Sequence, residues 1–150
     1  MQVDAQVEPL VRAALGAAVD KDPGKSEDAL RAMVDRGDAV VRQGLNLALA
    51  IGLAALFDIH NGRPSDEELQ DLAESFTEME SWAEFDHDTS LTFLTALADQ
   101  RSPENVLPPE TVTRLVFVVT AWLLAGFLQE DEHWYEYLDK ILDTLESAPA

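Results

Sequence analysis

The chain has 150 residues, 47% of them hydrophobic, and its 29 acidic and 10 basic residues give a formal net charge of −19. This length suffices for one buried core, the apolar fraction is too high for a disordered acidic tail, and the absence of cysteine excludes disulfides, thiolate metal sites and cysteine nucleophiles. The acidity argues against direct binding of nucleic acid or an anionic membrane and favours a basic partner.

The first two predicted helices are amphipathic. Apolar residues recur at helical spacing from about residue 3 to residue 19. A turn at residues 22–24 is expected to end this helix, and Ser26 is then expected to cap a short helix that closes at Gly37. Both helices would turn one apolar face toward a core.

The third predicted helix is long and apolar around most of its circumference. It is expected from Asp38 to about His60, and within it residues 45–57 are apolar except for Asn46. These 13 residues span only about 20 Å of helix, short of the roughly 30 Å of bilayer hydrocarbon, which favours a buried central helix. Small residues at nearly fourfold spacing form a seam that would let another helix approach closely: Gly44, Ala48, Gly52 and Ala55.

A capping box predicts the start of the fourth helix. Ser65 is followed three residues later by Glu68, and an apolar face then extends to about Ala83. A further helix is expected from about residue 88 to residue 98. Because residues 64–100 contain no Lys or Arg, the acidic charge is concentrated in this part of the chain.

Two more helices are predicted in the C-terminal third. A proline-containing loop at residues 101–110 precedes an apolar run at 115–128, which is also too short for an ordinary membrane span. An amphipathic helix is expected at about 131–145, followed by a flexible tail at 147–150. The sequence therefore predicts an all-α, single-domain bundle over residues 1–150, with about five to seven helices around two apolar central ones.

Two Glu-x-x-His pairs form the first candidate site. On a helix, residues three apart share a face, so Glu84 with His87, and Glu130 with His133, could each offer a carboxylate and an imidazole to a metal ion. Glu80 would lie on the same helical ridge as the first pair. The pairs resemble half of a ferritin-like di-iron centre, which implies a divalent metal or iron as cofactor.

The ferritin-like pattern is incomplete in this chain. Such a centre also takes one Glu from each of two further helices, and the two apolar helices offer no carboxylate at mid-length. In a chain with 29 acidic residues, any histidine readily has a carboxylate three residues away. The competing and favoured interpretation is therefore that both pairs are solvated at helix ends, where His would stabilise the negative end of the helix dipole, and that no cofactor is bound.

Two other acidic patterns resemble metal-dependent enzymes. His60, the adjacent His87 and Asp88, and the distant Asp139 occur in the order of HD-type phosphohydrolases, all-α enzymes whose metal activates water. In that family an apolar helix leads into the His-Asp pair, whereas acidic residues precede it here. The acidic run at 67–74 is similar to the magnesium-binding helix of all-α nucleotide pyrophosphohydrolases, but a solvated helix face explains it with fewer assumptions.

The acidic surface itself is the leading functional hypothesis. We expect a non-enzymatic, cytoplasmic protein that presents an acidic face to a basic partner, with mimicry of nucleic acid as the sharpest form of that idea. The competing interpretation is that the acidity only keeps the protein soluble in an acidic, lysine-poor proteome. The expected contact residues are Glu67, Glu68, Asp71, Glu74, Glu78 and Tyr135.

Two further expectations concern assembly and location. The protein could be a subunit of a homo-oligomer, with Tyr135 or the small-residue seam at the interface. The first ten residues contain Asp4 and Glu8 and lack the basic and apolar regions of a secretory signal. This is the basis for expecting a cytoplasmic location.

Overall fold

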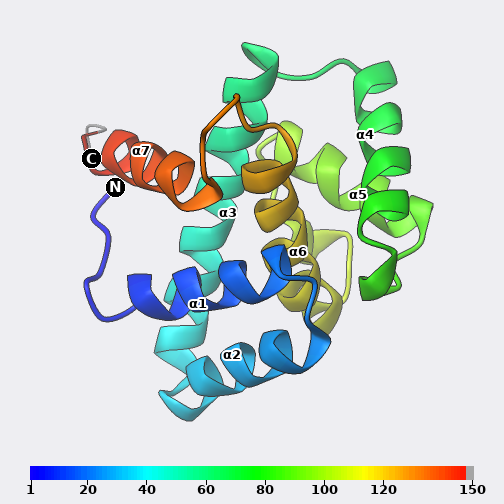
Figure 1. Ribbon diagram of the computed structural model, residues 1–150. Helices are drawn as coiled ribbons and strands as arrows, with labels where there is room; N and C mark the ends of the chain where they lie inside the picture. Colours follow the sequence, from blue (N-terminus) through cyan, green and yellow to red (C-terminus); the bar gives the residue numbers. More distant parts are fainter. Residues whose placement is uncertain (148–150) are drawn as a thin grey trace.

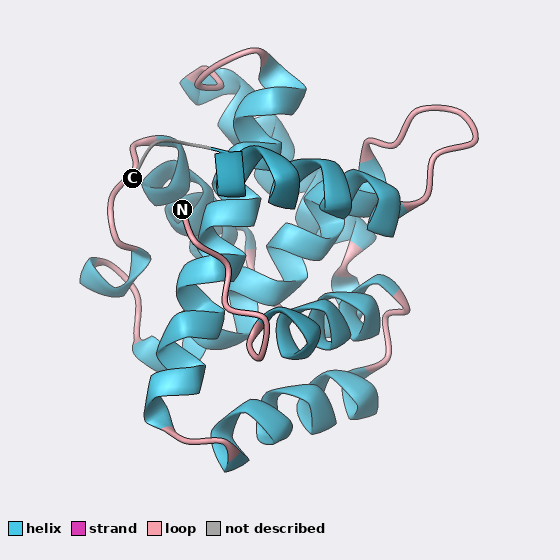
Figure 2. Ribbon diagram, turned by 90° about the vertical axis from the view of Figure 1, so that its left-hand side faces the viewer, coloured by secondary structure: helices cyan, strands magenta, loops and turns pink. Residues whose placement is uncertain are grey.

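The computed structural model describes residues 1–147, and within them the chain forms helices and no strand (Figures 1 and 2). The prediction of an all-α bundle is confirmed. The predicted tail lies outside the described residues except for Ser147, which ends the last helix. The elements are α1 (Glu8–Val19), α2 (Pro23–Asp35), α3 (Asp38–His60), α4 (Asp66–Met79), η1 (Ser81–Ala83), α5 (His87–Ala98), η2 (Pro103–Asn105), α6 (Pro109–Gly126) and α7 (Trp134–Ser147).

The start of α2 differs from the prediction. The helix begins at Pro23, and the Asp22 side chain caps it by accepting a hydrogen bond from the backbone N–H of Lys25 at 3.0 Å. Proline suits the first turn because its missing N–H would have no partner there. The predicted cap, Ser26, therefore lies inside the helix, and the turn is made by Lys21 with a left-handed φ of 54°.

The end of α3 and the start of α4 follow the prediction, whereas the expected cap of α3, Asp38, is its first helical residue and Gly37 takes the cap position. Asn61 closes α3 in the left-handed conformation. The capping box of α4 is complete, since Ser65 Oγ accepts from the backbone N–H of Glu68 at 3.1 Å and the Glu68 carboxylate accepts from the backbone N–H of Ser65 at 3.0 Å. However, α4 ends at Met79, and the predicted extension toward Ala83 is instead the short helix η1.

The two apolar helices α3 and α6 cross at the centre of the molecule (Figure 1). The hairpin of α1 and α2 covers one end of the central pair, α7 packs on both central helices at one side, and α4 and α5 lie on the side opposite α7. Within residues 1–147, buried side chains from all seven α-helices belong to a single hydrophobic cluster. The N-terminus lies against the last turns of α7, because the amino group of Met1 donates to the backbone oxygen of Leu145 at 2.9 Å.

The crossing of α3 and α6 depends on a glycine. A Cβ atom at Gly52 would lie 2.7 Å from Thr120 Oγ1, too close for any real contact. Thr120 is buried, and its hydroxyl donates to the backbone oxygen of Ala48 at 3.2 Å. The single polar side chain in the apolar run of α6 therefore binds the backbone of α3 where the two helices are nearest.

The small-residue seam of α3 serves more than one neighbour. Gly52 admits α6, while Gly44, two turns earlier, faces Met33 of α2 and Val11 of α1. Ala48, between the two glycines, and Ala55, after Gly52, are fully buried. The prediction of close helix approach is confirmed, and the seam is filled by this chain's own helices, which leaves Tyr135 as the residue on which the prediction of an oligomer interface rests.

Both central helices are long and apolar enough to cross a membrane by length and composition. The full helices have 23 residues in α3 and 18 in α6. The shortness of the apolar runs within them therefore does not exclude a membrane span, contrary to the expectation from the sequence. In the most apolar window, 44% of α3 and 61% of α6 is buried inside the protein. Buried helices of a protein core can be equally long and apolar. The length and composition of α3 and α6 are therefore only weak support for a membrane location.

Replacing Gly52 by alanine tests the helix crossing. We expect Gly52→Ala to lower the free energy of unfolding by about 1–3 kcal/mol, because its methyl group meets the Thr120 hydroxyl. In a Thr120→Ala background the same substitution should cost at least about 1 kcal/mol less. Chemical denaturation of the four proteins of this cycle measures the coupling.

Gly44→Ala is the matched control. Its nearest neighbour is the flexible thioether of Met33 at 3.1 Å, and none of the atoms near its Cβ position belongs to Thr120. Its effect should add to that of Thr120→Ala within about 0.5 kcal/mol. Additive behaviour at Gly52 as well would show that the contact does not limit the approach of the two helices.

Candidate functional site

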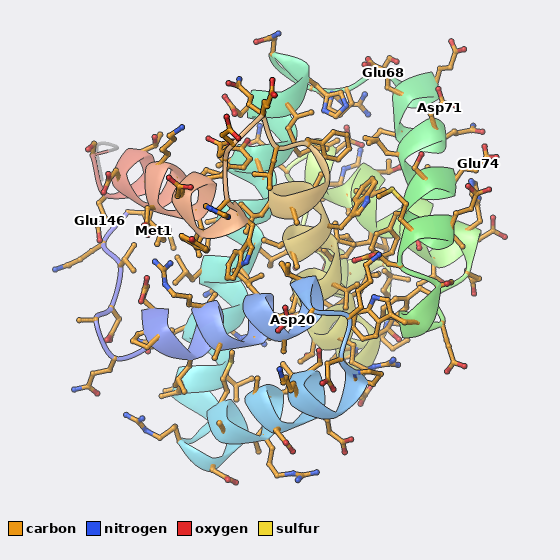
Figure 3. All side chains as sticks on the ribbon, in the orientation of Figure 1. Met1, Asp20, Glu68, Asp71, Glu74 and Glu146 are labelled. Carbon is orange, nitrogen blue, oxygen red and sulfur yellow. The ribbon has the colours of Figure 1, made fainter. Side chains whose placement is uncertain are left out.

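Four carboxylates form one stripe on the solvent side of α4, and we call Glu67, Asp71, Glu74 and Glu78 the α4 stripe. Intervals of four, three and four residues keep them within about 60° around the helix axis. Figure 3 shows Asp71 and Glu74 pointing away from the body of the molecule. The opposite side of α4 is buried, through Leu69, Leu72, Ala73 and Phe76.

The negative charge of the α4 stripe is not neutralised by basic side chains of the described residues. All four side chains are exposed. Among residues 1–147, no Lys, Arg or His lies within ion-pair distance of them. Like charges three or four residues apart on a helix repel each other. The stripe is thus a line of negative charge whose repulsion nothing in the described chain relieves.

Glu68 was predicted as a contact residue, but its carboxylate has a structural role. The backbone N–H of Ser65, with the Ser65 side chain, lowers the pKa of Glu68 by hydrogen bonding to the ionised form. The side chain lies a quarter turn away from the α4 stripe, over the first turn of the helix. Glu68 therefore stabilises the helix that carries the stripe.

The acidic residues of α7 differ from the α4 stripe because several are paired. Asp139 lies 2.7 Å from the guanidinium of Arg12 on α1, and Glu132, just before α7, lies 2.7 Å from the ammonium of Lys140. Glu136 accepts from the backbone N–H of His133 at 3.0 Å. These contacts fasten α7 to the bundle and to the preceding loop, so less of its charge is open to a partner.

Tyr135, the predicted aromatic contact residue, lies at the start of α7. Its side chain is 44% exposed. The ring stacks on His133 with centroids 5.1 Å apart and meets Trp134 edge-on. Tyr135 is therefore on the surface, on a different helix from the α4 stripe.

The helical geometry predicted for the Glu-x-x-His pairs is wrong. Glu84 ends η1 in the left-handed conformation with φ 61°, and His87 is the first residue of α5, so the chain turns between them. Glu130 and His133 both precede α7. His87 and His133 thus lie at the positive N-terminal ends of helices, the reverse of the dipole arrangement expected from the sequence.

The predicted metal ligands do not assemble. Within residues 1–147 there is no group of three or more His, Asp or Glu side chains that could hold a metal ion. This applies to Glu80, Glu84, His87, Glu130 and His133, and equally to the HD-type set. In the latter, His60 Nδ1 lies 2.8 Å from the backbone oxygen of Leu56, and Asp139 is occupied by Arg12.

Glu80 is a buried carboxylate that joins two parts of the fold. It caps the C-terminus of α4, is only 4% exposed, and lies 3.0 Å from the Lys21 ammonium, which also donates to the Met79 backbone oxygen. Burial raises the pKa of Glu80, against the opposing effects of Lys21 and Trp82. Its position could have been inferred, since it continues the core-facing spacing of Leu72 and Phe76.

Comparison with known proteins supplies no relative for this chain. No family model, no curated protein and no solved structure matches it. The interpretation of its surface therefore depends on the chemistry of its own residues.

The buried carboxyl group of Glu80 predicts a pH-dependent stability. Because its folded pKa is raised above the unfolded value, ionisation destabilises the folded state as pH rises through that interval. Glu80→Gln should therefore have a higher melting temperature than wild type at about pH 7, and the difference should shrink toward about pH 4, where both states of Glu become protonated. Thermal denaturation at several pH values measures this.

The control is Glu130→Gln, at an exposed glutamate before α7 that lies outside the α4 stripe and forms no ion pair within residues 1–147. It removes the same charge without a buried carboxylate, so it should not reproduce the pH-dependent gain. If Glu80→Gln were less stable than wild type at neutral pH, the attraction of Lys21 would outweigh the cost of burial.

Proposed function

We propose that the protein is a non-enzymatic interaction module that presents the α4 stripe to a basic protein. One observation carries the proposal: four exposed carboxylates are aligned directly opposite the buried face of α4 and have no cation of their own. A partner bearing Lys or Arg would remove the repulsion between them. The capping box and the buried face hold the helix in place before the partner arrives.

The spacing of the α4 stripe specifies the partner's chemistry. From Glu67 to Glu78 the stripe extends about 16 Å along the helix, with successive carboxylates about 5–6 Å apart. A matching surface presents three or four Lys or Arg side chains in a row of that length, as one face of a basic helix does. Arg would be favoured where two donors can reach one carboxylate.

The position of α4 at the edge of the fold also supports the proposal. Its principal neighbours are α5 and η1, and the rest of its circumference faces outward (Figure 1). Met79, at the end of the helix, is half exposed and lies about a third of a turn around the axis from the α4 stripe. An apolar side chain at the margin of the acidic face would add contact area to an otherwise electrostatic interface.

Removing charge from the α4 stripe tests the proposal. The stripe variant combines Glu67→Gln, Asp71→Asn, Glu74→Gln and Glu78→Gln. We expect low-salt affinity capture with wild type to recover a basic protein that the variant loses. Raising salt from about 50 to 200 mM should release it, because exposed charge pairs are screened. Binding of labelled octalysine, followed by anisotropy, should weaken about tenfold or more with the variant.

A second variant distinguishes the effect of the α4 stripe from the effect of the protein's net charge. It neutralises four scattered exposed acids that form no ion pair: Asp35→Asn, Asp131→Asn, Asp143→Asn and Glu146→Gln. Its net charge equals that of the stripe variant, yet it should retain the captured partner and most of the octalysine affinity. Equal losses in the two variants, or binding indifferent to salt, would contradict the proposal.

A further inference from the structure

A cavity of about 390 Å³ lies on a different part of the molecule, where the α1–α2 hairpin meets the segment between α4 and α5 and the start of α6. Its volume is within the range of small-molecule pockets, which are typically apolar with a few polar groups. The wall is mainly apolar, formed by Ala14, Ala18, Leu30, Phe85, Phe117 and Val118.

Arg114 provides the positive charge of this cavity. Its guanidinium lies over the Phe85 ring, 5.1 Å from the centroid, and donates to the backbone oxygen of Ala83 at 3.3 Å. A guanidinium has five N–H donors in a planar fork that fits a carboxylate. The ring and the carbonyl thus hold Arg114 in place while leaving donors for another group.

Arg114 is unusual among the basic residues of the chain. Of the ten, eight lie within 4 Å of a carboxylate in the described residues, and the exceptions are Arg36 and Arg114. Both are exposed, but Arg36 follows α2, whereas Arg114 lies at the rim of a cavity that it helps to line. Arg114 lines a cavity and has no carboxylate within 4 Å in the described part of the chain, although the chain is strongly acidic. Its guanidinium can therefore bind an anion that comes from outside the chain.

Ser26 adds a second polar group to the same lining. Its hydroxyl is buried, and it has no hydrogen-bond partner within residues 1–147. A buried hydroxyl without a partner destabilises the folded protein, and an acceptor on a bound molecule would remove that cost. Arg114 can only donate and the Ser26 hydroxyl can donate as well, so an oxygen acceptor on an apolar molecule fits the cavity.

We infer that this cavity binds a small organic monocarboxylate with an aromatic or branched aliphatic body. The carboxylate pairs with Arg114, a turn of the Ser26 side chain brings its buried hydroxyl to the ligand as a further donor, and the body packs against the apolar wall. Glu27 and Glu84 also line the cavity and are exposed. Their charges disfavour ligands with two or more negative groups, which is why the inference specifies a single carboxylate.

Calorimetric titration of the full chain tests the inference. The probes are 3-phenylpropionate and 4-methylpentanoate, with 3-phenylpropanamide and 2-phenylethylamine as neutral and cationic analogues. We expect saturable binding of at least one carboxylate below about 10 mM, and binding of the amide about tenfold weaker or more. These comparisons use the wild-type protein and need no variant to fold.

Two arginine variants assign the binding to the cavity. Arg114→Gln should weaken carboxylate binding about tenfold or more, while Arg36→Gln, the same change of charge at the other arginine without a carboxylate partner, should stay within about twofold of wild type. Circular dichroism checks that both are folded. Ser26→Ala should give a smaller loss, because one neutral hydrogen bond is removed.

Three results would overturn the inference. They are no saturable binding of either carboxylate at about 10 mM, equal affinity for carboxylate and amide, and tighter binding of the amine. Equal loss in Arg36→Gln and Arg114→Gln would also overturn it, since the effect would then be one of overall charge. None of these results bears on the α4 stripe, which lies outside the cavity lining.

Discussion

The fold depends on the approach of α3 to α6 at Gly52. With no Cβ in the way, the Thr120 hydroxyl reaches the backbone of α3 and the two helices cross at their closest. Because α6 is packed by α1, α3, α5 and α7, nearly all its side chains from Leu115 onward are apolar and buried. The remaining helices need bury only one face each, and their outer faces carry the charge.

Four of the ten basic residues connect segments that are distant in sequence. Arg12 reaches Asp139, Arg42 reaches Glu104, Arg63 reaches Asp99 and Lys21 reaches Glu80. The first three pairs are partly exposed, and such pairs contribute little energy individually. The pairing nevertheless affects where charge is left over, and the unpaired groups include the α4 stripe and Arg114.

Local sequence signals predicted the helices well where backbone chemistry decides the outcome. The caps formed by Ser65 with Glu68, and by Asn61 after α3, depend on hydrogen bonds between residues only a few positions apart. Such caps can be predicted from the sequence. The prediction failed at residues 80–87. There α4 gives way to η1 and a left-handed Glu84, because Glu80 turns inward to Lys21 of another helix, and no local pattern specified that partner.

Periodicity along single helices was enough to predict the helical class, the two apolar central helices and the alignment of the α4 stripe. Which charged groups meet depends on how the helices pack. The packing keeps the predicted metal ligands from assembling, pairs Asp139 of α7 with Arg12, leaves the α4 stripe unpaired and brings Arg114 and Ser26, 88 residues apart, into the lining of one cavity. Ion pairs and cavities form between helices distant in sequence, so their partners are set by the packing of the whole chain.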